Sequence, residues 1–153
     1  MFVLFFLVGC NNFRKIEPVT RGIEFVADIK YYNEHYECEC DIDSSGEMNL
    51  KFTYPAEIEG LEFNLSKNGI SAEYRELEYI NKNEVFKSTV ACLLWEVFLG
   101  VGDEVKSEND VFYALGETKE FDYRLELGSS GLPIKLKTNP DIAEIEFRNV
   151  RIK

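Results

Sequence analysis

The strongest constraint on this chain is an apolar residue at every second position, repeated in one segment after another. The first segment contains Ile23, Phe25, Ala27, Ile29 and Tyr31. Because side chains of a strand point alternately to two faces, this pattern predicts a strand with one buried and one solvated face. The pattern recurs in segments 36–42, 48–54, 61–65 and 70–74. We therefore predict a meander of about five antiparallel strands in the first half of the chain.

The spacing changes after residue 83, where apolar residues fall three or four positions apart. They are Val85, Phe86, Val90, Leu93, Leu94, Val97, Phe98 and Val101. This spacing predicts a helix of about sixteen residues, with Asn83 as its N-cap and Gly100 or Gly102 at its end. Further apolar side chains, such as Trp95, make the helix apolar almost all round. We expect it to be covered on most sides, in a trough of the sheet.

Four more strands are predicted after the polar loop 103–110. Alternating apolar residues recur in segments 112–116, 121–127, 132–136 and 143–147. Together the patterns predict an α+β fold of about nine antiparallel strands and one apolar helix. Residues 22–153 suffice for one domain with a single core. The net charge of −11 opposes nucleic-acid phosphates, so we expect no nucleic-acid partner.

The first ten residues, MFVLFFLVGC, end in a pattern that resembles the lipobox of bacterial lipoproteins. An apolar run, small residues and then Cys10 are the features that a lipoprotein signal peptidase requires. The resemblance implies a signal peptide over 1–9, a lipid on Cys10, a tether over 10–21 and a place on the extracytoplasmic face of the cell membrane. A buried N-terminal strand is the alternative, although the polar Asn11 and Asn12 do not suit it.

Several strand and turn segments resemble those of the LolA/LolB-type lipoprotein carriers, including Gram-positive and clostridial lipoproteins. The matching segments are 46–52 running to Pro55, 60–63 and 131–136, together with the lipobox at Cys10. The resemblance covers about residues 20–150 and implies a curled antiparallel sheet, an incomplete barrel, wrapped around helix. In that family the apolar concave face holds acyl chains. Segment 11–22, with Pro18 and Gly22, is more typical of a tether than of the N-terminal helix of the usual carrier.

An acyl-binding face would combine large apolar side chains of the strands and the helix. Our candidates are Phe25, Leu50, Phe52, Phe63 and Tyr123 from the strands and Leu94, Trp95 and Phe98 from the helix. The alternative is that these residues only pack the core, because an apolar stripe at strand or helix spacing usually does.

The cysteines do not form an obvious metal site. Cys38 and Cys40 point to one face of their strand, while His35 points to the other by alternation, so a shared zinc site is excluded. Cys92 would reach either cysteine if the helix lies over that strand, which leaves a disulfide open beside buried free thiols. We expect no metal and no cofactor.

The sequence also gives little support for catalysis. Segment 41–46 resembles the start of a calcium loop, but Phe52 stands where the bidentate Glu belongs, so a hairpin turn is expected. With one histidine and no GxSxG string, a Ser-His-Asp hydrolase has no visible parts. We expect a protein that is not an enzyme.

Two functional hypotheses follow. In the first, a lipid-anchored protein binds a hydrophobic ligand, the acyl chains of a lipid or of another lipoprotein, and carries or presents it. In the second, a lipoprotein of the same fold acts through a protein partner, as the resembling spore-germination lipoproteins do, and the helix fills the trough permanently. A packed interior with an exposed apolar or acidic patch favours the second.

Overall fold

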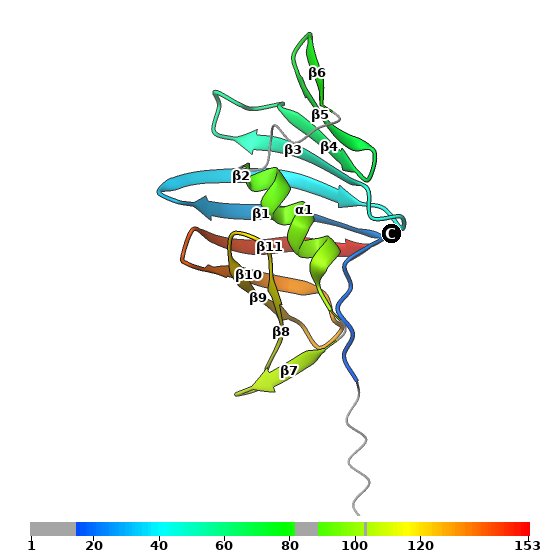
Figure 1. Cartoon of the computed structure of the whole chain (residues 1–153), viewed down its shortest axis with the longest axis vertical. Coiled ribbons are helices and arrows are strands. Elements are labelled where there is room, and N and C mark those ends of the chain that lie inside the picture. The colour runs from blue at the N-terminus through cyan, green and yellow to red at the C-terminus, as the bar shows by residue number, and fades with distance from the viewer. Residues whose placement is uncertain (1–14, 82–88, 103) are drawn as a thin grey trace, which may run out of the picture.

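The computed structural model describes residues 15–81, 89–102 and 104–153. These residues form one antiparallel sheet of eleven strands with a single helix on its concave face (Figure 1). The strands are β1 (Ile23–Tyr31), β2 (Glu34–Ile42), β3 (Met48–Tyr54), β4 (Glu62–Ser66), β5 (Gly69–Tyr74), β6 (Leu77–Asn81), β7 (Val105–Glu108), β8 (Val111–Glu117), β9 (Asp122–Leu127), β10 (Pro133–Asn139) and β11 (Ala143–Ile152). Helix α1 spans Val90–Gly100.

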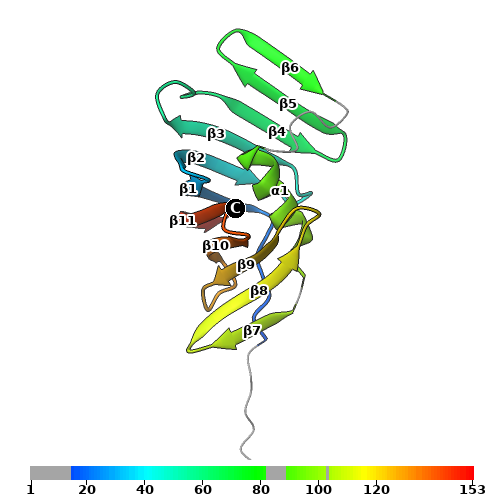
Figure 2. The ribbon, with the colours of Figure 1, turned by 60° about the vertical axis from the view of Figure 1, so that its left-hand side comes forward.

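The sheet has two halves that meet at its centre. One half runs from β2 to β6 and the other from β10 back to β7, and β1 and β11 join them by pairing with each other (Figure 2). In this central pair Ile29 faces Ile145, and Ile23 faces Ile152 near the other end. Every neighbouring pair is antiparallel. The sheet is curled and open, with β6 and β7 as its two edges.

The core lies between the concave face of the sheet and α1. The alternation read from the sequence holds along β1, where Ile23, Phe25, Ala27 and Ile29 are buried. Along β2, β3 and β9 the same period places apolar side chains inward and charged ones outward. Because strand side chains alternate, burying one face fixes the register of each strand. The predicted general kind of fold is confirmed.

Helix α1 is shorter than the sequence predicts. It begins after Thr89, whose side-chain oxygen accepts a hydrogen bond from the backbone N–H of Cys92 at 3.3 Å. It ends at Gly100, one of the two predicted stops. The predicted N-cap, Asn83, lies outside the described residues. The helix contacts β4 on one side and β8 on the other, so it bridges the two halves of the sheet inside the trough.

Two of the eleven strands were not predicted. The sequence pattern predicts no strand where β6 lies, and β7 falls within segment 103–110, which the sequence predicts to be a loop. Both are edge strands, and neither has a regular buried face: Leu77 and Ile80 of β6 are exposed, and β7 offers only Val105 to the core. The count of nine strands is therefore wrong, because alternation marks only strands that bury one side.

No helix in the described part of the chain is long and apolar enough to cross a membrane. The lipobox cysteine, Cys10, lies outside the described residues.

Candidate functional site

The eight predicted ligand-binding residues come together in one apolar cluster. Phe25, Leu50, Phe52, Phe63, Leu94, Phe98 and Tyr123 are buried in the core between sheet and helix. Trp95 is half-buried and packs against the same cluster. Strand alternation and the 3.6-residue period of the helix bring these residues together from β1, β3, β4, β9 and α1.

Three aromatic rings in mutual contact fill the centre of the trough. The rings of Phe25 and Phe98 stack with centroids 5.3 Å apart, and both contact Phe147 edge-on at 5.1 and 5.6 Å. Phe147 lies in the predicted strand 143–147, but it was not among the candidate residues. Phe147 pairs with Ala27 of β1, and this pairing places it under the helix. The sequence does not reveal which residues of β1 and β11 pair.

A second aromatic group lines the trough towards β4. Phe52 contacts Tyr36 at 5.8 Å and Phe63 at 6.2 Å, both in edge-on geometry. Edge-to-face pairs at these distances add about 0.5–1.5 kcal/mol each beyond the area that they bury. The large side chains predicted to hold a ligand therefore contact one another.

Two hydrogen bonds fix polar groups of the cluster. The indole Nε1 of Trp95 donates to the carbonyl oxygen of Gly46 at 3.3 Å, and the hydroxyl of Tyr123 donates to the carbonyl oxygen of Val97 at 3.4 Å. Burial raises the pKa of Tyr123 above its ordinary value. The gap lined by Trp95, Phe98 and Met48 is too narrow to admit a water-sized molecule.

Larger hollows lie on the opposite, outer face of the sheet. One of ≈ 450 Å³ is lined by side chains that alternate with the buried ones, among them Asp41, Asn49 and Asn64. A second of ≈ 460 Å³ includes Glu24 and Arg151, and a third of ≈ 650 Å³ lies across β8, β9 and β10. Charged side chains contribute to all three, and the third also contains Leu115, Gly116 and Tyr123.

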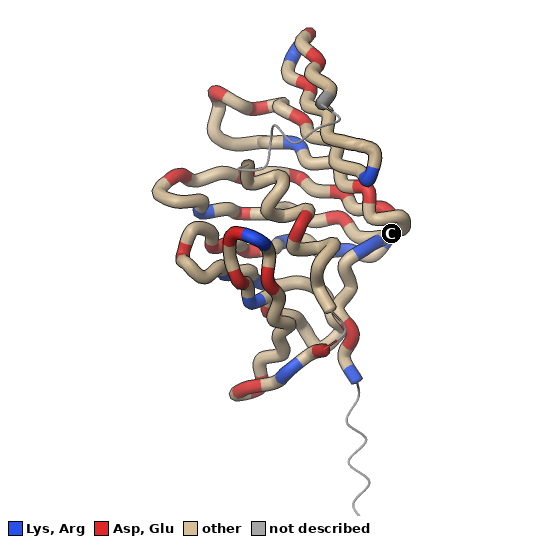
Figure 3. Tube along the Cα trace, viewed as in Figure 1, with Lys and Arg blue, Asp and Glu red and all other residues tan. Residues whose placement is uncertain are grey.

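Acidic and basic residues occur on neighbouring strands of the sheet (Figure 3). Several of them pair across the sheet: Lys51 with Glu62 at 2.9 Å, Lys135 with Glu146 at 3.2 Å, Arg151 with Glu24 at 3.6 Å and Lys153 with Asp41 at 2.7 Å. Ion pairs as exposed as these contribute little to stability. They make the middle of the outer face a mixed, polar surface.

The three cysteines within the described residues are buried and free. Cys38, Cys40 and Cys92 form no disulfide, which is the thiol alternative left open by the sequence. Burial raises the pKa of Cys40 well above its usual value, and the neighbouring Cys38 adds to the shift. His35 lies on the opposite face of β2, as predicted, with its Nε2 2.9 Å from Asp28. In the described ranges, no group of three metal-ligating side chains comes together.

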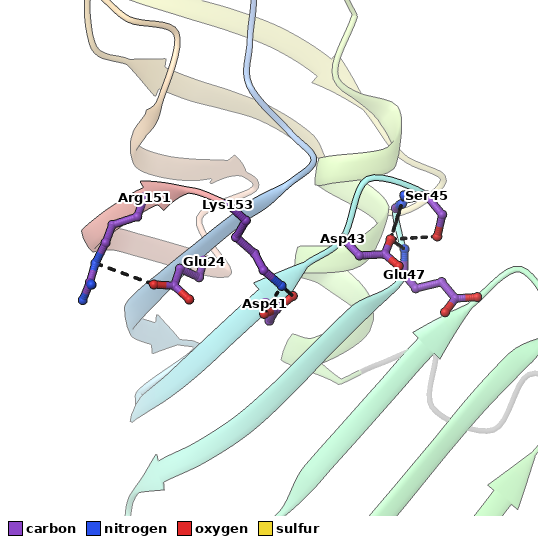
Figure 4. Close-up of polar contacts among 8 residues, drawn as sticks. Glu24, Asp41, Asp43, Ser45, Glu47, Arg151 and Lys153 are labelled. Atoms are coloured by element: carbon purple, nitrogen blue, oxygen red, sulfur yellow. Dashed lines mark hydrogen bonds and ion pairs between the residues drawn. The ribbon is translucent and has the colours of Figure 1, made fainter.

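Segment 41–46 contains the end of β2 and most of the predicted turn between β2 and β3, which spans 43–47 (Figure 4). The Oδ1 atom of Asp43 accepts hydrogen bonds from the hydroxyl of Ser45 at 2.7 Å and from the backbone N–H groups of Ser45, Gly46 and Glu47 at 2.8, 2.9 and 3.0 Å. The Ser45 hydroxyl and these N–H groups hold the pKa of Asp43 below its ordinary value. The carboxylate thus holds the turn together.

No protein-family model and no curated protein matches this sequence. Among solved structures, an uncharacterized conserved protein from Thermus thermophilus superposes with a TM-score of 0.56 at 9% identity, covering 86% of this chain and 78% of that one. A LolA superfamily protein from Nitrosomonas europaea superposes with a TM-score of 0.44 at 7% identity, covering 86% and 84%. At these identities the comparisons concern the fold alone. The curled open sheet with a helix in its trough is the general kind of fold that the sequence predicts.

Proposed function

We propose that this protein is a non-catalytic lipoprotein that acts by binding a protein partner and carries no lipid in its trough. In this proposal Cys10 is lipidated and anchors the domain on the extracytoplasmic face of a cell membrane. The observation that carries the proposal is the filled trough: α1 buries seven of its eleven residues there, including Leu94, Val97 and Phe98.

Magnitudes favour the helix over an acyl chain as the occupant of the trough. Five large side chains of α1 are buried, and each is worth about 1.5–3 kcal/mol, so expelling the helix costs about 8–15 kcal/mol. A chain of about sixteen carbons gains about 0.8 kcal/mol per methylene, or about 13 kcal/mol in all. The two magnitudes overlap, and the ligand also loses its translational freedom on binding, so the exchange has no clear driving force. The predicted ligand-binding residues serve as core in this proposal.

A partner has an exposed apolar edge to bind. In β6 Leu77 is 75% exposed and Ile80 64% exposed, and within the described residues β6 pairs only with β5. Exposed Glu73, Glu76 and Glu78 surround these apolar side chains. An unpaired strand edge accepts an extended segment through its backbone. The charge and the apolar side chains therefore suit a partner segment with basic and apolar residues.

Native mass spectrometry of residues 12–153, purified without detergent and incubated with fatty acids and phospholipids, tests whether the trough takes a ligand. We expect the bare protein mass. A stoichiometric lipid that is released on denaturation would contradict the proposal and restore the carrier hypothesis. The anchor is tested separately, because membrane-extracted protein should carry a diacylglyceryl mass on Cys10 that the Cys10→Ala variant lacks.

The partner edge is tested with the double variant Leu77→Lys and Ile80→Lys, expressed in the source cell. We expect the membrane protein that crosslinks to the parent chain to be lost from this variant. Leu115→Lys is the matched control, because Leu115 is an exposed leucine on β8 in the other half of the sheet. Equal crosslinking of all three proteins would contradict a role for the β6 edge.

A further inference from the structure

We propose that one end of the half-barrel lies against the membrane surface, a proposal that rests on the proposed lipid at Cys10. This anchor end is defined by the turn 43–47 between β2 and β3, the turn 128–132 between β9 and β10, and the segment 15–22. The end of β11 and the C-terminal end of α1 lie at the same end of the sheet (Figure 1).

The segment before β1 is fixed to the anchor end by backbone hydrogen bonds. The N–H of Val19 donates to the carbonyl oxygen of Gly131 at 2.9 Å, and the N–H of Gly22 donates to that of Asp43 at 3.2 Å. The N–H of Lys153 donates to the carbonyl oxygen of Gly22 at 2.8 Å. These bonds come from three different strand ends. The chain that leads towards Cys10 therefore leaves the folded domain at the anchor end.

Gly131 shows how closely this segment is seated. Its φ of +81° is left-handed, and a Cβ atom there would lie 2.0 Å from the carbonyl oxygen of Glu17. Only glycine allows both this backbone conformation and this approach. Segment 15–22 therefore packs directly against the turn between β9 and β10.

The remaining chain is too short to let the anchor end move far from the lipid. Five residue steps separate Cys10 from Lys15, and they span at most about 18 Å when fully extended. The nine residues of β1 extend about 30 Å further. The turn at 32–33, between β1 and β2, lies at the opposite end of the sheet and is directed away from the membrane in the proposed orientation.

Three neighbouring side chains at the anchor end are of types that suit a membrane interface. Trp95 is half-buried, Leu99 is 37% exposed and Arg21 is exposed. They adjoin one another around Gly46, where a Cβ atom would lie 3.3 Å from the Arg21 Nε and 3.4 Å from a Leu99 methyl group. Tryptophan and arginine, with an apolar body and a polar end, are favoured where hydrocarbon meets headgroups.

Fluorophores at the two ends test this orientation. Ser129→Cys labels the anchor end and Asn33→Cys the opposite end, and both positions are exposed. The native Cys38, Cys40 and Cys92 are buried and should not take the label. The full lipidated chain is placed in phosphatidylcholine vesicles with a quencher on a fraction of the headgroups. We expect the Ser129 label to lose most of its emission and the Asn33 label to keep most of its own.

Equal quenching at the two ends, or stronger quenching at Asn33, would overturn the proposal. The mass of the Cys10 peptide separates this result from failure of the anchor: a lipidated Cys10 with equal quenching contradicts only the orientation, whereas an unmodified Cys10 contradicts both proposals. Ser130→Cys and Lys119→Cys form a second pair at the same two ends, should either first variant fail to fold.

Discussion

Phe98 of α1 lies over Phe25 of β1, with ring centroids 5.3 Å apart and ring planes inclined by only 24°. The contact joins the helix to the strand at the centre of the sheet, where the two halves of the half-barrel meet. A helix attached at this point is part of the core, and its removal would expose the faces of both halves.

Phe98→Ala should therefore destabilise the protein severely. We expect the free energy of unfolding to fall by about 3–5 kcal/mol, because the substitution leaves a cavity beside the rings of Phe25 and Phe147. Urea unfolding followed by circular dichroism measures it. Leu99→Ala, one position along the helix and partly exposed, is the control and should cost under about 1 kcal/mol. Equal losses would show that the trough does not depend on the helix.

Gly116→Ala should disturb the opposite wall of the trough. A Cβ atom at Gly116 would lie 2.2 Å from the Tyr123 ring, so the ring must move and its hydrogen bond to Val97 is lost. We expect a loss of about 1–3 kcal/mol in thermal or urea unfolding. Gly128→Ala is a matched control, since the nearest atom to its Cβ is 3.7 Å away. If both alanines cost the same, Tyr123 does not lie over Gly116.

Asp43 should make stability depend on acid pH. Hydrogen bonds lower its folded-state pKa below the ordinary 3.8, so the folded state binds this proton less readily than the unfolded state. The stabilisation is complete above pH 3.8 and is lost as the pH falls through the lower folded-state pKa.

Asp43→Asn keeps an oxygen acceptor and has no charge to titrate. Urea midpoints of the parent chain should fall more steeply with decreasing pH in this range than those of the variant. Parallel profiles would show that the carboxylate does not hold the turn.

The buried thiols give a chemical readout of packing. Cys38, Cys40 and Cys92 should resist an aromatic disulfide reagent in the native protein and all react in urea, because burial excludes the reagent and raises the pKa of Cys40 and Cys92. Lipidated chain is used, so that Cys10 does not react. Rapid modification of Cys92 alone under native conditions would indicate that the helix leaves the trough.

Alternation predicts well the strands that bury one face. The bounds of β1 follow from Ile23 to Tyr31 alone, and the apolar helix was correctly placed in the trough because its side chains leave no polar stripe. The edge strands were missed since neither packs a full face: Ile80 interrupts the alternation of Leu77 and Tyr79, and β7 has a single apolar residue.

The candidate site depends on register, which the sequence does not specify between distant strands. Residues such as Phe25 and Phe98 were expected on the concave face from their spacing. Whether these residues line a cavity or contact one another depends on the distance between the helix and the sheet. Side chains from several strands together set that distance. Phe147 was missed as a neighbour of Phe98 for the same reason, because only the pairing of β1 with β11 brings it there.

The central pairing also determines how such a chain reaches its native state. Most neighbouring strands in each half are connected by short turns and can form hairpins early, but Ile23 meets Ile152 only after almost the whole sequence between them is gathered. Contacts of such long range slow folding. The closure of β1 on β11 is therefore expected to limit the folding rate, and a chain without β11 keeps two unjoined half-sheets with exposed strand edges, which are prone to aggregate.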